Sequence, residues 1–460
     1  MSQRWVIYGN DASSWSTALF LHHQLPARLI QLTLVVAPAN ADLGLSLNSD
    51  SVDFHRLLDI DEREFLIATQ ASIQLAHQFS HWSRPAQELL LSSTPYGDSH
   101  QQIDFFHWLH AAKSTGGNYS SEHFNLNTTA AKRGHFSPLP QDAPAQFKNL
   151  RHGYQVSEAR YCKFLRTLAE RRGLKLIEAE IANHTAPEPG SHTVDLVVRN
   201  GKRETLAFDY FITTKSAGAE TAASDWRDCS AFIPTSKSET HISPASAQPL
   251  FVSHQRHQKV WQSTINTQRE CIINRHTPVA SNAKPAPGFL TKPWQGNHIY
   301  LGQAACSLAD IFENSLAITQ RALFHLLALF PFRPSPEKVA EFNRRVSADC
   351  ESLLDLHNGI FFSAGLIEQK THSFDARLAL FLQHGYARQS EHEFLSDSCW
   401  LVLLAELYQW PDHLSLQLDN MDKSAIEKFL NFASAHCAST VRTLPPFTNL
   451  LTYLSKAHQP

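Results

Sequence analysis

The sequence lacks the charge runs and long apolar stretches that mark polyanion-binding or membrane-spanning proteins. Its 40 basic and 43 acidic residues give a formal net charge of -3, and no five like charges follow one another, so no nucleic-acid partner is expected. No stretch approaches the roughly 18 apolar residues that span a bilayer. The start, MSQRWVIYGNDASSW, lacks the pattern of a signal peptide. We therefore expect a cytoplasmic protein without a membrane partner.

The sequence also lacks paired cysteines and several common catalytic motifs. Its 7 cysteines show no C-x-x-C spacing, which argues against a zinc site, a redox dithiol or a disulfide framework and predicts buried free thiols. It contains no G-x-S-x-G, G-x-x-x-x-G-K-[ST] or H-E-x-x-H motif, so nothing supports a serine hydrolase, a P-loop enzyme or a zinc peptidase. His107 and His110 have no evident third ligand, and no metal site is expected.

What is present is enough apolar sequence for a sizeable core. Of 460 residues, 43% are hydrophobic, which predicts a globular protein of one to three domains. A short apolar run over 5–8 ends at Gly9, and serines at 13–14 are possible caps for a helix over 15–25. A second apolar run over 32–36 follows at the distance of a βαβ unit. This start is typical of a Rossmann-like dinucleotide fold.

The rest of the chain first mixes strands with helices and then becomes helical. Helical spacing over 161–168 precedes an apolar run over 174–177, and the run 206–212 is predicted to be one strand. The segment 235–293 is rich in Ser, Pro, His and Gln, which predicts loops and turns. An apolar helical face covers 316–330, and helical patterns with short loops follow from about 335 to the end.

A family resemblance enters at residues 294–305, which read WQGNHIYLGQAA. This segment resembles the W-x-G-N-x-x-x-x-G-x-A-A stretch of flavin-dependent tryptophan halogenases. Five other segments match that family in the same order: the opening strand and turn, IDEREFLIATQASIQLAHQFSHW over 60–82, FFHW over 105–108, residues 153–173, and FNRR over 342–345 with the helices behind it. Collinear matches over essentially the whole chain are far more specific than one motif.

The resemblance implies an α/β fold of the Rossmann-like flavoprotein monooxygenase/halogenase type with a mostly helical carboxy-terminal region. It places an FAD-binding-like box, made of the Rossmann-like part and a substrate sheet, over residues 1–335. The helical region, residues 336–460, is expected to pack on that box.

The implied cofactor is FAD, and its pyrophosphate site is altered. The family pattern G-x-G-x-x-G-W reads GNDASSW here, so Gly9 and Trp15 are kept while Asp11 and Ser14 replace glycines. Bare amides at a helix start hold the pyrophosphate, and Asp11 puts a negative charge beside a negative ligand. Val36 stands where an acidic residue accepts bonds from the ribose. The implied cofactor-binding positions are Gly9, Trp15, Gly44 (in GLSLNS, against G-x-G-E-A-T), Gly302, Ala304 and Ala305.

The implied catalytic positions are altered as well. The family's halogenating lysine corresponds to Gln74, and a carboxamide carries no charge and forms no chloramine-like adduct. The family's glutamate corresponds to Phe312, with Glu313 one residue away. The W-x-W-x-I-P signature reads WQSTIN over 261–266, which keeps Trp261 and Ile265 as pocket residues and puts serine in place of the second tryptophan.

Three functions stay open at this point. The first is a pseudoenzyme that keeps the fold and acts through association, as a homodimer or as a heterodimer with an intact halogenase relative, or with a substrate. The second is an FAD-dependent halogenase or monooxygenase on tryptophan, an indole or a peptide-bound aromatic, supplied by a separate flavin reductase. The third is a small-molecule binding protein that uses the vacated cavity.

Overall fold

A computed structural model describes residues 2–456 except 39–41, 140–141, 183–186, 189, 216–224, 280–285, 310, 313–314, 331–334, 388–389, 413–417 and 419–420. The chain forms two compact units, each assembled from three stretches. Unit 1 comprises Met1–Gln70, Val156–Thr240 and Pro278–Leu354, and unit 2 comprises Ala71–Gln155, His241–Thr277 and Asp355–Pro460. This division differs from the single boundary predicted between residues 335 and 336, and that boundary stays a prediction.

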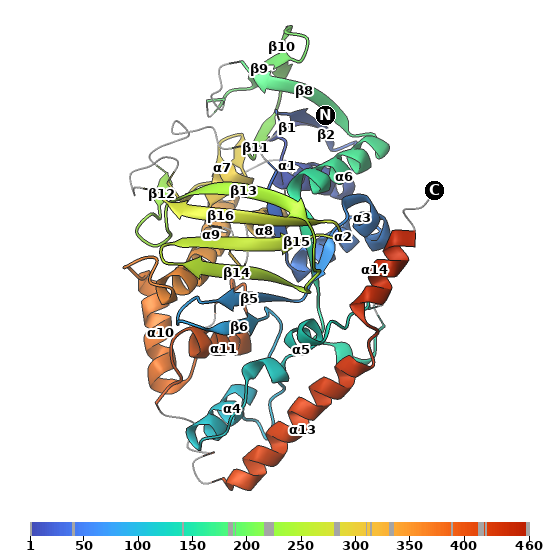
Figure 1. Ribbon diagram of the computed structural model, residues 1–460. Coiled ribbons are helices and arrows are strands. Elements are labelled where there is room, and N and C mark those ends of the chain that lie inside the picture. Colours follow the sequence, from blue (N-terminus) through green and yellow to red (C-terminus); the bar gives the residue numbers. More distant parts are fainter. Residues whose placement is uncertain are drawn as a thin grey trace. The chain divides into compact units, whose positions relative to one another are not determined.

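Unit 1 is organised around an eight-stranded sheet of order β10-β9-β8-β2-β1-β11-β19-β18 (Figure 1). The successive pairs from β8 to β19 are parallel, and the pairs at both edges are antiparallel. Central parallel strands are covered on both faces and therefore consist of apolar runs, which is why the predicted strands over 5–8 and 32–36 are confirmed. The strands are β1 Gln3–Gly9, β2 Ile30–Val36, β8 Lys175–Ile181, β9 Thr193–Val198, β10 Arg203–Ala207, β11 Tyr210–Thr213, β18 Trp294–Gln295 and β19 His298–Tyr300.

Helix α1 follows β1 directly and packs against α6 and α8 in unit 1. The helices predicted over 15–25, 161–168 and 316–330 are confirmed as α1, α6 and α8. This unit also contains a short strand β3, a three-stranded sheet of order β12-β17-β20 and several shorter helices. Their bounds are α1 Ala12–Gln24, β3 Gly44–Leu47, α2 Ser49–Leu57, α3 Glu62–Thr69, α6 Glu158–Arg171, β12 Trp226–Asp228, β17 Gly288–Leu290, α7 Gly302–Ala305, β20 Cys306–Ser307 and α8 Ser315–Leu329, with α9 Pro336–Ser363 beginning here and ending in unit 2.

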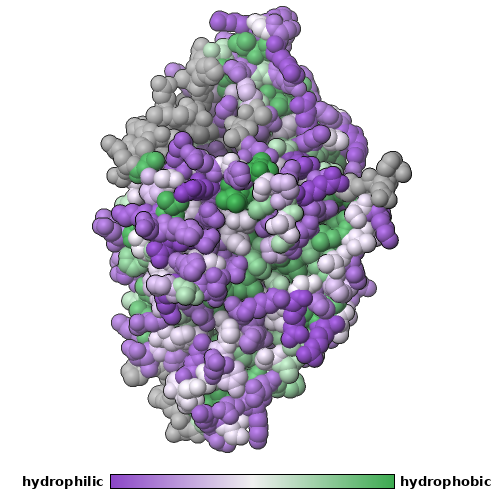
Figure 2. All heavy atoms as spheres, in the orientation of Figure 1, coloured by the Kyte–Doolittle hydropathy of each residue, from purple (hydrophilic) through white to green (hydrophobic). Residues whose placement is uncertain are grey.

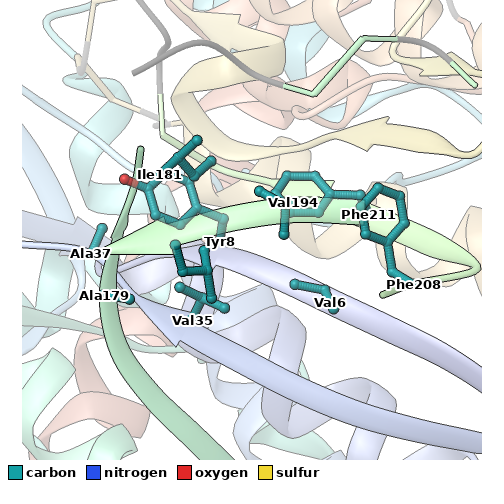
Figure 3. Close-up of a cluster of buried hydrophobic side chains, with 10 residues drawn as sticks. Val6, Tyr8, Val35, Ala37, Ala179, Ile181, Val194, Phe208 and Phe211 are labelled. Carbon is teal, nitrogen blue, oxygen red and sulfur yellow. The ribbon is translucent and has the colours of Figure 1, made fainter. Parts of the chain in front are cut away.

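A cluster of buried apolar side chains covers one end of the eight-stranded sheet (Figure 3). It joins β1, β2, β8, β9 and β11, so it fixes the carboxyl ends of β1 and β2 relative to each other. Burying one such Val or Phe side chain contributes about 1.5–3 kcal/mol. The cluster consists of Val6, Tyr8, Val35, Ala37, Ala179, Ile181, Val194, Leu196, Phe208 and Phe211.

The run 206–212, predicted to be one strand, is two strands. β10 ends at Ala207 and β11 begins at Tyr210. Between them Asp209 accepts a hydrogen bond from the backbone N–H of Arg4 at 2.7 Å and forms an ion pair with the Arg4 guanidinium at 3.0 Å. This polar contact turns the chain between the two strands.

Unit 2 is organised around a sheet of order β13-β16-β15-β14-β5-β6. The loops predicted over 235–293 are therefore wrong, because this segment contains β13 to β17. In β14 and β15 buried residues alternate with less buried ones, so polar residues such as Gln255 and Gln262 share strands with apolar ones and hide the two-residue period. The strands are β4 Ser72–Gln74, β5 Ala76–Ser80, β6 Glu88–Leu91, β7 Gly153–Ser157, β13 Ser236–Pro244, β14 Phe251–His257, β15 Val260–Asn266 and β16 Glu270–Pro278.

The carboxy-terminal part of the chain is helical, as predicted. Helix α13 packs against α4 and α5. None of the helices in the described ranges combines the length and the apolar character that a membrane crossing requires, and Figure 2 shows hydrophilic residues over most of the face in view with apolar ones interspersed. The bounds are α4 Phe105–Ser114, α5 Leu126–Arg133, α10 His372–His384, α11 Asp397–Leu407, α13 Lys423–Arg442 and α14 Phe447–Lys456, with short 3₁₀ helices at Ser121–Phe124 and Ala145–Phe147.

The seven cysteines are all free, as the absence of paired spacing predicts. Four are buried and three are half-buried: Cys229, Cys306, Cys350 and Cys399 in the first group, and Cys162, Cys271 and Cys437 in the second.

Candidate functional site

The amino terminus of α1 is capped by the chain's own carboxylate. Asp11 is the N-cap residue, and its Oδ1 accepts the backbone N–H of Ser14 at 2.7 Å. The Ser14 hydroxyl oxygen accepts the backbone N–H of Asp11 at 3.0 Å in return, which completes a capping box. Asp11 Oδ1 also accepts the Thr214 hydroxyl at 2.9 Å. The prediction that the serines at 13–14 cap the helix is therefore wrong: Asp11 is the cap, and Ser14 is its reciprocal partner.

This cap lies where a helix would offer its amides to an anion. The positive end of the helix dipole and the unpaired N–H groups of the first turn make that place favourable for phosphate. Here Asp11 is 6% exposed and Ser14 is 0% exposed, so the carboxylate is enclosed with its partners. A second carboxylate, Glu158, accepts the N–H of Ala12 at 3.4 Å. Two internal carboxylates thus accept two of the N–H groups of the first turn, those of Ala12 and Ser14.

Gly9 and Gly302 both pack against Thr214. A Cβ at Gly9 would lie 2.2 Å from Thr214 Oγ1, and a Cβ at Gly302 would lie 2.8 Å from the Ser13 Cβ. The Gly302 N–H, at the start of α7, donates to Thr319 Oγ1 at 3.1 Å, and that hydroxyl lies 3.1 Å from Ser13 Oγ. Both glycines are required by close packing of the protein on itself.

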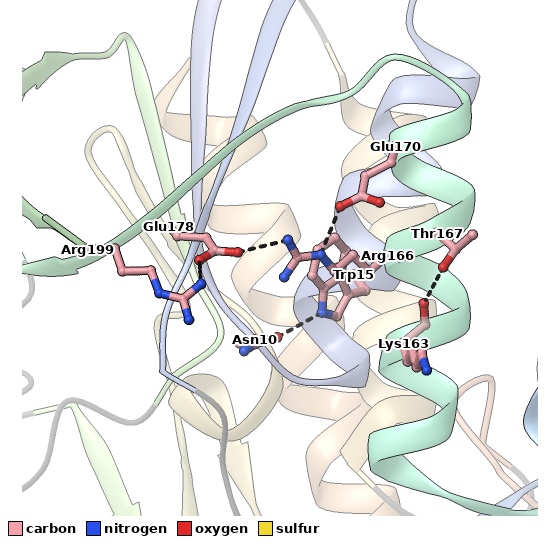
Figure 4. Close-up of polar contacts among 8 residues, drawn as sticks. All are labelled: Asn10, Trp15, Lys163, Arg166, Thr167, Glu170, Glu178 and Arg199. Atoms are coloured by element: carbon pink, nitrogen blue, oxygen red, sulfur yellow. Dashed lines mark hydrogen bonds and ion pairs between the residues drawn. The ribbon is translucent and has the colours of Figure 1, made fainter.

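Trp15 ties the turn to the end of β2 (Figure 4). Its indole N–H donates to Asn10 Oδ1 at 3.1 Å, and Asn10 Nδ2 donates to the carbonyl of Ala37 at 2.8 Å. Since Trp15 is buried, its ring fills the space beside the turn. The side chains of Asn10 and Trp15 therefore cover the region between the β1–α1 turn and the end of β2.

The neighbouring strand offers a carboxylate opposite Val36, but that carboxylate is paired. Glu178 on β8 lies in register with Val36. Its two oxygens bind the guanidinium groups of Arg166 and Arg199, each at 2.8 Å (Figure 4). Hydrogen bonds from these two arginines, and then their charges, lower the pKa of Glu178. Glu178 is thus a carboxylate held in two ion pairs at the strand position next to Val36.

The other predicted cofactor residues lie in packed surroundings. Gly44 is the buried first residue of β3. Ala304 and Ala305 belong to a small apolar cluster with Leu290 and Tyr300. As arranged, the residues at the start of α1 do not fit a pyrophosphate, because Asp11 takes the amide that would bind it and adds a repelling charge.

In unit 2, Gln74 begins a buried chain of four polar side chains. Gln74 Nε2 lies 2.8 Å from His77 Nε2, and His77 Nδ1 lies 2.9 Å from His254 Nε2. The other ring nitrogen of His254 lies 2.9 Å from the Ser263 hydroxyl. The two imidazoles are stacked with centroids 5.2 Å apart. The structure thus joins Gln74 to Ser263, the two residues that the resemblance assigns to the family's lysine and second signature tryptophan.

The chain of four is electrically neutral. Burial lowers the pKa of His77 to about 3, and burial, followed by the nearby His77 and His276, holds the pKa of His254 well below its ordinary value. Because the Gln74 amide nitrogen only donates, His77 Nε2 accepts, His77 Nδ1 donates to His254 Nε2, and His254 Nδ1 donates to the Ser263 hydroxyl oxygen. Near neutral pH neither histidine of this hydrogen-bonded series of four carries a positive charge.

Neither histidine was predicted from the sequence. His77 and His254 are 177 residues apart, and each stands in a strand that sequence patterns describe poorly. The available signal was indirect. Gln74 and Ser263 are polar residues at positions where the family pattern has a lysine and a tryptophan, and a buried polar side chain needs polar partners nearby.

Trp261 and Ile265 share the buried face of β15 with Ser263. Trp261 stacks on His276 with centroids 4.8 Å apart and meets the edge of Phe361 at 5.1 Å. Ile265 belongs to a cluster with Val252 and Ile272. Both predicted pocket residues lie in the core of unit 2, and their role as pocket walls stays a prediction.

Phe312 is buried and has a positive φ of 67°, a left-handed conformation that a residue with a bulky side chain adopts rarely. It lies in the sequence of unit 1, whereas Gln74 lies in unit 2. Glu313 falls outside the described residues. The structure therefore does not assign a carboxylate to the glutamate position.

Comparison with known proteins matches the chain to one family. The family model described as tryptophan halogenase matches residues 4–249 and 275–423. BrvH, a flavin-dependent halogenase from Brevundimonas sp. BAL3, has a TM-score of 0.87 and 19% identity, with 99% of each chain covered. Xcc4156, a flavin-dependent halogenase from Xanthomonas campestris, has a TM-score of 0.88 and 22% identity, with 99% of this chain and 98% of that chain covered.

A third similar structure is SttH, a tryptophan 6-halogenase from Streptomyces toxytricini, with a TM-score of 0.80 and 16% identity over 98% of this chain and 99% of that one. None of the curated proteins matches the chain. At these identities the likeness to solved structures establishes the fold, including the helical carboxy-terminal region.

Proposed function

Because the chain belongs to the tryptophan halogenase family, we propose that it is a non-halogenating member that keeps the fold and acts by association, with an intact relative or with the substrate of one. The observation that carries this proposal is the Asp11 cap. A phosphate at the start of α1 would have to displace a buried carboxylate from the Ser14 amide and the Thr214 hydroxyl. Bonds of this kind to a charged group contribute about 1.5–3 kcal/mol each.

The residues at the catalytic positions support the same proposal. A lysine offers an ammonium or a nucleophilic amine, whereas Gln74 offers an uncharged carboxamide that is bound to His77. Because the pKa of His77 is lowered to about 3, its imidazole supplies no positive charge near neutral pH. The halogenating chemistry that the resemblance assigns to this position has no equivalent group in the Gln74 to Ser263 chain.

The first half of the proposal is tested by FAD binding and by activity. The purified protein is expected to show no flavin absorbance and no saturable heat on titration with FAD. Supplied with reduced FAD from a separate flavin reductase, halide, oxygen and tryptophan or an indole, it is expected to form no halogenated product, while a tryptophan halogenase assayed in parallel does. Stoichiometric FAD together with product formation would establish the enzyme alternative instead.

The second half is tested by measuring mass in solution. Light scattering after size-exclusion chromatography, on the chain alone and co-expressed with an intact halogenase of the same family, is expected to show a complex with a defined stoichiometry. Calorimetry with tryptophan and with indole tests association with a substrate. If the chain stays monomeric with the relative present and binds neither compound, the association proposal is wrong even when FAD binding is absent.

A further inference from the structure

An open cavity of about 630 Å³ in unit 2 is lined by basic side chains and by no acidic one. It lies at the end of the β14–β15 hairpin and beside the loop that joins β5 to β6. Four of its lining side chains are basic, namely His81, Arg256, His257 and Arg275. The net charge of -3 for the whole chain counts histidine as neutral, so on the same count this lining carries the two positive charges of Arg256 and Arg275.

Arg256 is fixed in place without being neutralised. Its Nε donates to the carbonyl oxygens of Trp82 at 2.7 Å and His81 at 3.2 Å, and its Nη1 donates to the carbonyl of Gln258 at 3.3 Å. Carbonyl groups orient a guanidinium but do not cancel its charge. Among the described residues no carboxylate pairs with Arg256, and its Nη2 has no protein acceptor. The guanidinium is thus held in position while its Nη2 donors stay available for a ligand.

The other basic groups add donors to the same cavity. Arg275 is exposed and has no ion-pair partner in the described part of the chain. The Nδ1 atom of His81 accepts the backbone N–H of Ala86 at 3.2 Å, which leaves Nε2 as the protonated nitrogen of the ring. The cavity therefore presents several N–H donors that face no protein anion.

The backbone around Arg256 holds an uncommon conformation at two places. His81 has a φ of 53° and Gln258 a φ of 56°, both in the left-handed region that non-glycine residues avoid at a cost of about 1 kcal/mol or more. These two residues also supply carbonyl groups to Arg256. The strained turns thus set the position of the guanidinium.

We propose that this cavity is an anion site that binds a phosphate group, either free or carried by a small organic molecule. The planar fork of an arginine pairs with two oxygens of a phosphate, and two arginines match its double negative charge. The cavity volume exceeds that of a phosphate group alone, which leaves room for an organic part. This inference is independent of the proposed association and of FAD.

The test is calorimetric titration with inorganic phosphate, glycerol phosphate and acetate at ionic strength held constant with sodium chloride. Saturable binding of a phosphate is expected, and Arg256→Gln and Arg275→Gln are each expected to weaken it about tenfold, the equivalent of one lost charge-assisted bond. Arg203→Gln removes the same charge from an exposed position on β10 and is expected to change nothing. Tighter binding of glycerol phosphate than of inorganic phosphate would identify a carried phosphate group.

Arg275→Gln is the decisive variant, because the Arg275 side chain makes no hydrogen bond to the residues that the structure describes, whereas Arg256→Gln releases three. Heats that match the sodium chloride blank, or equal losses in Arg275→Gln and Arg203→Gln, would overturn the proposal. Acetate binding as tight as phosphate binding would overturn the assignment to phosphate.

Discussion

Replacing Asp11 and Ser14 together by glycine is expected to restore an anion site at the start of α1. The change restores both glycines of the family pattern, removes the buried carboxylate and frees two donors, the backbone N–H of residue 14 and the Thr214 hydroxyl, which Asp11 Oδ1 holds at 2.7 Å and 2.9 Å. It also removes the charge that would repel a pyrophosphate. The expected result is tighter binding of FAD.

The magnitude follows from the two donors. A hydrogen bond to a charged group contributes about 1.5–3 kcal/mol, so two regained bonds give about 3 kcal/mol, which is about a hundredfold in Kd. Glycine at an N-cap costs only a few tenths of a kcal/mol relative to aspartate, and losing the bond from Thr214 to the charged carboxylate costs about 1.5–3 kcal/mol more. The variant should therefore fold with a stability lower by about 2–3 kcal/mol.

Titration with FAD, followed by calorimetry and flavin fluorescence, measures this effect. Asp11→Asn keeps the shape of the cap and removes only its charge, so a smaller gain is expected. The matched control is Asp61→Gly at the start of α3, where the side chain accepts the Glu64 N–H at 2.7 Å in the same way. That variant loses the same kind of cap bond and should gain no affinity.

An unchanged Kd in a folded double variant would refute the reasoning. It would mean that the start of α1 is not where a pyrophosphate would bind, and that the comparison of GNDASSW with the family's glycine motif is out of register. A gain of equal size in Asp61→Gly would mean that loosened helix ends, rather than the Asp11 site, bind FAD.

Three further predictions concern stability, each measured by urea denaturation. Gly9→Ala should cost at least about 2 kcal/mol, because the added Cβ would lie 2.2 Å from Thr214 Oγ1; a neutral result would show that Thr214 moves freely. Ser263→Ala should cost about 1–3 kcal/mol by leaving a buried nitrogen of His254 without its partner, and a change below 0.5 kcal/mol would show that this bond is not formed (about the scatter for surface substitutions). Burial lowers the pKa of His77 to about 3, so between that pH and ~6.5 the unfolded chain binds a proton that the folded chain does not. The contribution of His77 to the free energy of unfolding is therefore fully present above pH ~6.5 and falls by about 1.4 kcal/mol per pH unit as pH decreases toward 3. His77→Gln should flatten that slope, and an unchanged slope would contradict the low pKa.

The parts of the fold that were predictable are those with buried apolar runs. The runs over 5–8 and 32–36 form neighbouring parallel strands in register, because strands covered on both faces leave no place for polar residues. The strands from β13 to β17 were missed, since Ser, Gln, His and Thr are interspersed among their apolar residues and a mixed composition conceals the alternation.

The candidate site was predictable as a set of altered positions but not as an arrangement. The sequence shows that Asp11 replaces a glycine and that Gln74 replaces a lysine of the family pattern. It does not show that Asp11 caps α1 and binds Thr214, or that Gln74 reaches Ser263 through two histidines. These partners lie far along the chain, 203 residues away for Thr214 and 177 residues between the histidines.

By itself the sequence determined the family, the Rossmann-like start and the helical end, because each depends on residue identity or on local periodicity. Only the tertiary structure decided how distant side chains meet: a carboxylate enclosed at the start of α1, a neutral Gln74 to Ser263 chain in the core of unit 2, and an arginine held by carbonyl groups at the β14–β15 hairpin. Hydrogen bonds between distant segments form only after the sheets have paired, so their partners are set by strand register and not by neighbours in the sequence.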